Sequence, residues 1–354
     1  MNGLARIREL ELEKKSIETP ILWITSSIKE KPIIWKELPV RNLMLNTLDL
    51  IKSCKEAKIK KKIGFSGNLF LDSGGFKLTR KQPKIILENV IRYQINSDAD
   101  LLATLDIPLD VNDTNYIQKI KINKCIELAK IYAQRYDKRI LPVIHGHDYS
   151  TLKFMLKKLS QMFALDKFCI GGLVPLLYPT KFNKIKELIK ILIRIRQEYK
   201  NSFIHVFGAG GALTMHLFIY VGFDSVDTSS WIVRAGYGKI HLPGLGEAYI
   251  QPETGRPNKI RYIDWQNYHC ECPVCKNKDP EIILPQLNSR TSHGRILRAI
   301  HNAWVYLHES ELIKERIKEG TYEEFLDERF KNTNLYKIYK EIKSYIRLRR
   351  LDTF

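Results

Sequence analysis

The sequence has few of the features that mark secreted or membrane-inserted proteins. Only 6 of its 354 residues are cysteines, and three of these stand singly in apolar segments, unlike the dense pattern of disulfide-stapled domains. Its first fifteen residues, MNGLARIRELELEKK, contain no apolar stretch of the length that a secretion signal requires. We therefore expect a cytoplasmic protein.

Long apolar runs and common nucleotide motifs are also missing. Residues 202–223 carry no Asp, Glu, Lys or Arg, but they include two histidines and four glycines, which favours a buried strand, a loop and a helix over a membrane span. No G-x-G-x-x-G follows the first predicted strand, and neither a P-loop nor an H-E-x-x-H motif is present. We expect no membrane partner.

Acidic residues are outnumbered by basic ones, 39 against 58, which gives a formal net charge of +19. Such a surplus favours a polyanionic partner, above all nucleic acid. A general enrichment in lysine would produce the same surplus, because the charge is spread along the chain. Charge therefore favours a nucleic-acid partner without identifying it.

Short apolar runs bounded by turn residues predict eight strands, with segments of helical periodicity between most of them. The predicted strands are 21–25, 42–46, 68–72, 101–106, 139–145, 167–171, 203–208 and 224–228, and the predicted helices are 47–60, 85–96, 115–135, 151–162, 181–200 and 212–221. This alternation indicates an α/β fold, a closed (β/α)8 TIM barrel. We assign the barrel with its reactive site to residues 1–231. Residues 232–354 should form a zinc-binding subdomain whose helices, near 294–318 and 321–349, pack on the barrel.

Three cysteines crowd into one short turn, Cys270-Glu271-Cys272-Pro273-Val274-Cys275. Zinc prefers four thiolate or imidazole ligands in a tetrahedron, and the C-x-C-x-x-C spacing is typical of such sites. His269, His293, His301 and His308 are candidates for the fourth ligand, and we favour His301 because an amphipathic helix would hold its ring rigidly. Four protein ligands leave no open position, so the Zn²⁺ should be structural.

Acidic side chains and glycines follow several predicted strands. In TIM barrels the chemistry takes place at the C-terminal strand ends, where Asp72, Asp106, His145 and Asp227 should meet. Neighbouring glycines would let a flat, polar heterocycle approach the backbone closely. A helix cap or a turn explains any one of these aspartates equally well, but their convergence favours a site. Two carboxylates, one a nucleophile and one an acid/base, equip a protein for displacement at an anomeric carbon.

Several segments resemble, in order and spacing, the tRNA-guanine transglycosylase superfamily. They are Asp72-Ser73-Gly74-Gly75-Phe76, Asp106, Ile170-Gly171-Gly172-Leu173, Gly208-Ala209-Gly210, Gly222-Phe223-Asp224-Ser225-Val226-Asp227 and the set Cys270, Cys272, Cys275 and His301. Members of this superfamily exchange a guanine in nucleic acid for a 7-deazaguanine without breaking the chain. The resemblance therefore implies a pentosyltransferase whose ligands are a nucleic acid and a 7-deazaguanine base.

The resemblance also implies roles for individual residues. Asp227 would attack C1′ of the target nucleotide, and Asp72 would act as general acid/base. Asp224 matches a less critical acidic position. Asp106 would accept hydrogen bonds from the base, and Phe76 would stack on it. The remaining residues expected to bind the base are Ser73, His145, Gly171, Gly172, Leu173 and Gly208.

Two departures from the family pattern bear on the substrate. His145 and Lys77 stand where glutamines are usual, although the Gly-Gly-Leu-Val-Pro segment resembles archaeal-type members that use 7-cyano-7-deazaguanine (preQ0). The residues after Asp227, Thr-Ser-Ser-Trp, lack the Leu-Pro-Thr-Arg run of bacterial tRNA enzymes and look more like the DNA-modifying branch. DNA is thus favoured over tRNA by a small margin.

Other classes of function stay open on the sequence alone. The same base exchange on tRNA is the first alternative, and a non-catalytic nucleic-acid-binding accessory subunit is the second. An unrelated barrel glycosidase acting on free nucleosides is the third. A homodimer or an assembly with a partner protein is compatible with the sequence, which does not identify the target nucleotide either.

Overall fold

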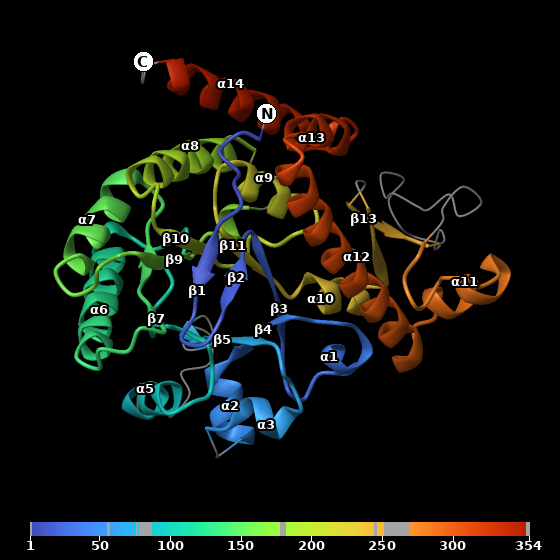
Figure 1. Ribbon diagram of the computed structural model, residues 1–354, viewed down its shortest axis with the longest axis horizontal. Coiled ribbons are helices and arrows are strands. Elements are labelled where there is room, and N and C mark those ends of the chain that lie inside the picture. The colour runs from blue at the N-terminus through green and yellow to red at the C-terminus, as the bar shows by residue number, and fades with distance from the viewer. Residues whose placement is uncertain are drawn as a thin grey trace.

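The computed structural model describes residues 2–54, 57–75, 77, 87–177, 182–243, 246–250 and 270–351. Its core is a sheet of nine parallel strands in the order β7-β6-β5-β4-β3-β11-β10-β9-β8, surrounded by helices (Figure 1). The strands are β3 (Ile21–Ser26), β4 (Asn42–Asn46), β5 (Asn68–Asp72), β6 (Leu101–Ala103), β7 (Ile140–Leu141), β8 (Val143–His145), β9 (Lys167–Gly171), β10 (Phe203–Val206) and β11 (Ser225–Thr228). The predicted α/β barrel is confirmed.

The fifth predicted strand, 139–145, is divided into β7 and β8. Pro142 lies between the two pieces, and proline has no N–H to donate to a sheet ladder. Strand β7 pairs with β6, whereas β8 pairs with β9, so the divided strand joins the two edges of the sheet. The Pro142 carbonyl still accepts the Cys169 N–H at 2.9 Å. Because β7 and β8 are two pieces of one strand, the nine strands form an eight-stranded barrel that closes at Pro142.

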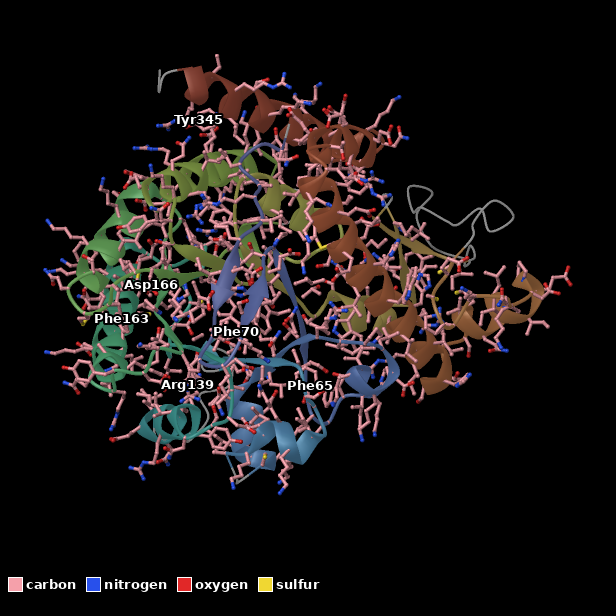
Figure 2. All side chains as sticks on the ribbon, viewed as in Figure 1. Phe65, Phe70, Arg139, Phe163, Asp166 and Tyr345 are labelled. Atoms are coloured by element: carbon pink, nitrogen blue, oxygen red, sulfur yellow. The ribbon has the colours of Figure 1, made fainter. Side chains whose placement is uncertain are left out.

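Two apolar layers lie on the two sides of the strands. Alternate strand residues point into the barrel, among them Trp23, Met44, Phe70 and Cys169, and Figure 2 labels Phe70 beside strands β4 and β5. The intervening residues point outward, where they pack against the helices. This period of two decides which polar side chains of a strand enter the barrel.

The helices described around the barrel are α1 (Ile34–Glu37), α2 (Thr47–Ser53), α3 (Ile59–Ile63), α5 (Leu87–Ile95), α6 (Asn115–Ala133), α7 (Tyr149–Leu159), the 3-10 helix η1 (Val174–Leu176), α8 (Phe182–Glu198), α9 (Thr214–Tyr220) and α10 (Ser230–Gly236). The predicted helical segments are found in their predicted order, whereas α1, η1 and α10 were not predicted. The predicted helix 47–60 is two helices. Asp98 Oδ1 accepts the N–H groups of Ile59 and Lys60 at 2.8 and 3.2 Å, so a carboxylate from a distant loop caps the start of α3.

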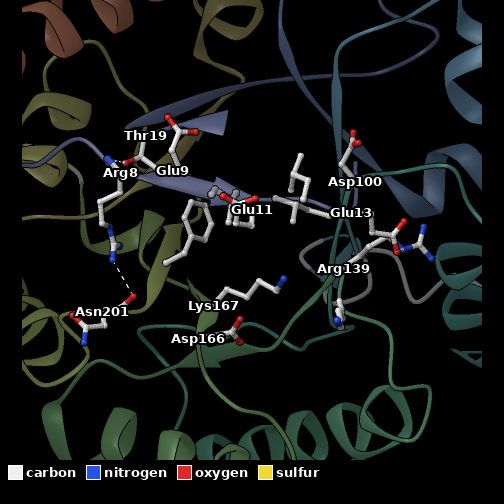
Figure 3. Close-up of a pocket in the computed structure, with 15 residues that line it drawn as sticks. Arg8, Glu9, Glu11, Glu13, Thr19, Asp100, Arg139, Asp166, Lys167 and Asn201 are labelled. Carbon is white, nitrogen blue, oxygen red and sulfur yellow. Dashed lines mark hydrogen bonds and ion pairs between the residues drawn. The ribbon is translucent and has the colours of Figure 1, made fainter. Parts of the chain in front are cut away.

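An N-terminal hairpin, β1 (Glu9–Glu11) and β2 (Ser16–Glu18), lies at the N-terminal end of the barrel. It was not predicted. Leu10 and Ile17 join the interior apolar layer and so plug that end. Beside the hairpin, a cavity of about 500 Å³ is lined by charged side chains of both signs, including Arg139 and Asp166 (Figure 3).

In the described residues of the C-terminal part lie a two-stranded antiparallel sheet and four helices: β12 (Lys239–Leu242), β13 (Gly246–Tyr249), α11 (Pro280–Asn288), α12 (Ser292–Lys318), α13 (Tyr322–Phe330) and α14 (Tyr336–Leu351). Helix α12 runs from the region of α11 to α13 along one side of the barrel (Figure 1). Its Asn302 Nδ2 donates to the carbonyls of Trp231 and Lys239 at 3.1 and 3.2 Å, which fastens it to α10 and β12. Among the described residues, no helix is both long enough and apolar enough to cross a membrane.

Candidate active site

Asp227 lies in β11 and points into the barrel, with 8% of its surface exposed. Its Oδ2 accepts the Thr25 hydroxyl at 2.8 Å, and its Oδ1 accepts the Gly208 N–H at 2.6 Å. Gly208 has φ = +68°, and a Cβ there would lie 2.2 Å from Val174 Cγ2, so the position needs glycine on two counts. The carboxylate is held by neutral donors, which fix its orientation without neutralising its charge.

Asp72 ends β5 and is partly open to solvent at the same mouth. Its Oδ2 accepts Asn46 Nδ2–H at 2.8 Å, and its backbone carbonyl accepts the Thr47 hydroxyl at 2.7 Å. Burial first, and then the charges of Asp106 and Asp227, raise the pKa of the Asp72 carboxyl to about 7, against opposing hydrogen bonds. A carboxyl with this pKa can both give and take a proton near neutral pH.

Asp106 lies three residues after β6 and joins two other predicted site residues. Its Oδ1 accepts the Ser73 hydroxyl at 2.7 Å, and its Oδ2 lies 2.8 Å from His145 Nε2. With Asp106 ionised, Nε2 must carry the hydrogen. Nδ1 of the fully buried His145 has no hydrogen-bond partner among the described residues. These three side chains form one polar wall of the mouth.

The glycine segment after β9 closes on that wall. A Cβ at Gly171 would lie 2.6 Å from His145 Cε1, so a side chain there would displace the imidazole. Gly172 follows, and its carbonyl lies 3.3 Å from His147 Nε2, whereas Leu173 is buried. The structure therefore brings Ser73, Asp106, His145, Gly171 and Gly172 together, and Gly208 lies against Asp227. Phe76 lies outside the described residues.

Asp224 lies at the opposite end of β11, away from the carboxylates of the mouth. It is 2% exposed, and its Oδ2 accepts Arg196 Nη1–H and the Ile204 N–H at 2.8 and 2.9 Å. Its Oδ1 pairs with the Arg8 guanidinium. A buried carboxylate between two arginines forms a structural ion pair, in which its charge is already compensated.

Several neighbours of the carboxylates were not predicted from the sequence. Thr25, next to the last residue of β3, donates to Asp227, and Asn46, the last residue of β4, donates to Asp72. His205, in β10, has Nε2 3.6 Å from Asp227 Oδ1. The alternation along 203–208 could have found it, because residue 205 must face the same side as the inward Phe203.

The predicted metal cluster is assembled. The ligand atoms of Cys270, Cys272, Cys275 and His301 all lie within 4.8 Å of one another. His301 Nδ1 lies 3.5, 3.3 and 3.6 Å from the three sulfurs in turn. A zinc tetrahedron with Zn–S of about 2.3 Å and Zn–N of about 2.1 Å has S···N edges of about 3.6 Å. The donor set therefore fits Zn²⁺.

The surroundings of His301 prepare it as a ligand. Its Nε2–H donates to the His241 carbonyl at 2.9 Å, which leaves the Nδ1 lone pair facing the thiolates. Of the other candidates, His293 is exposed and His308 stacks on Trp304, while His269 lies outside the described residues. Cys272 and Cys275 belong to a small apolar core with β12, β13 and α11, so a bound ion would tie this part of the chain to α12.

The fold and the two clusters together define a class: TIM-barrel proteins with carboxylates gathered at the mouth and a Cys3His cluster that could hold a metal ion in the C-terminal part. The model of the queuine tRNA-ribosyltransferase family matches residues 2–334. The chain belongs to this family.

Curated relatives of the chain include archaeal proteins. The chain is 29% identical to the tRNA-guanine(15) transglycosylase of Pyrococcus abyssi, over 96% of this chain and 57% of the relative. It is 26% identical to the enzyme of the same name from Thermococcus onnurineus and 28% identical to that of Pyrococcus furiosus, in each case over 97% of this chain and 58% of the relative. The chain thus spans somewhat more than half the length of these relatives.

Proposed function

We propose that this protein is a tRNA-guanine transglycosylase that exchanges a guanine in tRNA for a 7-deazaguanine through a covalent intermediate on Asp227. The observation that carries the proposal is the arrangement at the barrel mouth, where Asp227 is oriented by neutral donors beside Asp72, a carboxyl with a pKa of about 7. Family membership supports the same chemistry.

In the first half of the reaction, a carboxylate oxygen of Asp227 forms a bond to C1′ as the C1′–N9 bond of guanine breaks. Protonated Asp72 supplies the proton that guanine takes with the electron pair. In the second half, ionised Asp72 removes the N9 proton of the incoming base, N9 bonds to C1′, and Asp227 leaves as a carboxylate. A pKa of about 7 populates both protonation states of Asp72 at neutral pH.

The base would bind against the wall formed by Asp106, Ser73 and His145. Asp106 has lone pairs left to accept from the amino and imino edge of a guanine-type base, and Gly171, Gly172, Leu173 and Gly208 would offer backbone groups. We propose stacking on Phe76 from the resemblance alone. The incoming base we propose is 7-cyano-7-deazaguanine, which competition among 7-substituted deazaguanines would test.

The polymer we propose is tRNA rather than DNA. The sequence alone slightly favoured DNA, but the names of the archaeal relatives specify tRNA. The net charge of +19 suits either polymer, and in either the target base must leave its stack to reach a pocket inside a barrel mouth.

We further propose that the Cys3His cluster holds a structural Zn²⁺ and that residues 232–354 form the subdomain it stabilises. Four protein ligands leave no position for a substrate. Removing the ion with a chelator should unfold the region around α11, detected by faster hydrogen exchange there, and weaken tRNA binding. Exchange that responds to added metal while protection and binding stay constant would contradict a structural role.

The decisive experiment measures incorporation of labelled 7-deazaguanine into tRNA and, separately, into DNA. Asp227→Asn should abolish exchange and the covalent protein–tRNA adduct that denaturing gels detect. Asp166→Asn is the matched control, because Asp166 is exposed at the other end of the barrel. Wild-type protein that binds tRNA but forms no adduct and exchanges no base would instead favour an accessory subunit.

A further inference from the structure

His205 is a fully buried histidine inside the barrel that the proposed reaction does not use. It lies in β10, one strand from Asp227. Its ring packs edge-on against Phe70 and Phe207, with centroid distances of 5.1 and 4.5 Å. Two aromatic rings therefore limit the orientations that the imidazole can take.

A chain of hydrogen bonds fixes which nitrogen of His205 carries the hydrogen. Trp23 Nε1 lies 2.7 Å from Ser225 Oγ, and an indole N–H only donates. Ser225 Oγ lies 2.8 Å from His205 Nδ1. Among the described residues, Nδ1 is therefore the acceptor for the hydrogen of the Ser225 hydroxyl. Nδ1 thus accepts, and the neutral ring carries its hydrogen on Nε2.

That Nε2–H has one conspicuous neighbour, Oδ1 of Asp227, at 3.6 Å. The distance is too long for a hydrogen bond, and Nε2 has no other partner among the described residues. Oδ1 is held meanwhile by the Gly208 N–H. A movement of a few tenths of an ångström would bring Nε2–H into contact with Oδ1, and catalytic hydrogen bonds commonly tighten only in the substrate complex.

We propose that His205 is a positioning residue for Asp227, donating Nε2–H to Oδ1 when the nucleic acid is bound. The inference rests on the proposed function. The bond would hold the carboxylate in one orientation for attack on C1′ and would stabilise it again as the leaving group when the incoming base displaces it. His205 keeps its proton throughout, so no proton transfer is added to the reaction.

The buried position of His205 explains why a histidine can act as a neutral donor to Asp227. Burial lowers the pKa of His205, against the opposing effect of Asp227, which keeps the ring neutral in the absence of substrate. A neutral donor orients the carboxylate without forming a permanent ion pair, unlike the arginines that surround Asp224. The Trp23 and Ser225 side chains would therefore set the tautomer on which this role depends.

The test replaces His205 by phenylalanine, which fills the ring volume without a donor, and by glutamine, which restores an N–H at a similar reach. We expect His205→Phe to lower kcat for base exchange about 10- to 100-fold while KM for tRNA changes less than about threefold. His205→Gln should recover most of the loss. Ser225→Ala, which releases the tautomer, should lie between wild type and His205→Phe.

His293→Phe provides the matched control, since His293 is exposed at the start of α12; it should keep wild-type kinetics. Unfolding curves establish that each variant is folded. Full kcat in a folded His205→Phe variant would overturn the inference, as would an equal loss of kcat in His205→Gln, which would indicate packing instead. Failure of the proposed function is distinguishable, because wild-type protein itself would then exchange no base.

Discussion

The carboxylates at the two ends of the barrel have different kinds of partner. At the N-terminal end, Asp224 pairs with Arg8 and Arg196, Asp100 with Lys60 at 2.6 Å, and Asp137 with Arg139 at 2.6 Å. At the C-terminal end, the carboxylates of Asp72, Asp106 and Asp227 are held by hydroxyl, amide and imidazole groups. Within the described part of the chain, no lysine or arginine pairs with them.

Under the proposed function, the arrangement at the mouth lowers folding stability and keeps the carboxylates available for the reaction. At the N-terminal end, the arginine or lysine partner neutralises the charge of the carboxylate, and the pair stabilises the structure. Neutral donors at the mouth leave three carboxylates to repel one another, and the raised pKa of Asp72 is in part the consequence. Asp224 and Asp227, three residues apart in the sequence, illustrate both outcomes.

Asp224→Asn should have the largest effect on folding stability. It leaves the Arg196 guanidinium, 3% exposed, without its counter-charge, and breaking a buried pair costs about 3–5 kcal/mol. Urea unfolding measures this loss. Exchange activity per folded molecule should stay close to wild type, because Asp224 touches no group at the mouth. A stable variant without activity would contradict the assignment of Asp224 to structure.

The contrast between the two ends also shows how far sequence reasoning reached. Strand alternation placed Asp72, Asp106, His145 and Asp227 at one mouth, because the carboxyl ends of parallel strands must meet there. The cysteine spacing indicated the metal cluster for an equally local reason. The cysteine spacing is a signal within six residues, and the strand-end residues recur with the strand–helix repeat of the barrel.

What the sequence could not reveal depends on contacts between distant segments. Thr25 donates to Asp227, 202 positions away, and Asn46 donates to Asp72, 26 positions away. In the sequence, neither Thr25 nor Asn46 differs from an ordinary residue near the end of a strand. The arginine partners of Asp224 come from the N-terminus and from α8. The break at Pro142 could have been predicted, since a proline inside a predicted strand argues against an unbroken ladder.

Asp72→Asn tests the other end of the barrel. The Asp72 carboxyl has a pKa near 3.8 when unperturbed and about 7 in the fold. Between these pH values the native state holds a proton that the unfolded chain has lost, so native stability falls as pH rises. Asparagine cannot ionise, and its Oδ1 can still accept Asn46 Nδ2–H.

The Asp72→Asn variant should therefore match wild type in stability below about pH 4 and exceed it above about pH 7. The pKa shift corresponds to at most about 4 kcal/mol, and about 2 kcal/mol is expected once partial access of solvent is allowed for. Urea unfolding at pH 4 and pH 8 measures the difference, and base exchange should be lost at both. An advantage that is constant with pH would mean that Asp72 is ionised throughout this range.

His145→Gln should have the smallest effect and bears on which base the mouth selects. The imidazole has Nε2–H toward Asp106 and therefore a lone pair on the buried Nδ1, beside the Gly171–Gly172 turn. A glutamine amide can keep the bond to Asp106 and present a second N–H instead. We expect a carbonyl at position 6 of the base to be favoured and an amino group disfavoured, by about 1 kcal/mol in total. The ratio of inhibition constants for guanine and 2,6-diaminopurine measures this, and equal shifts for both would show that His145 acts on the base only through Asp106.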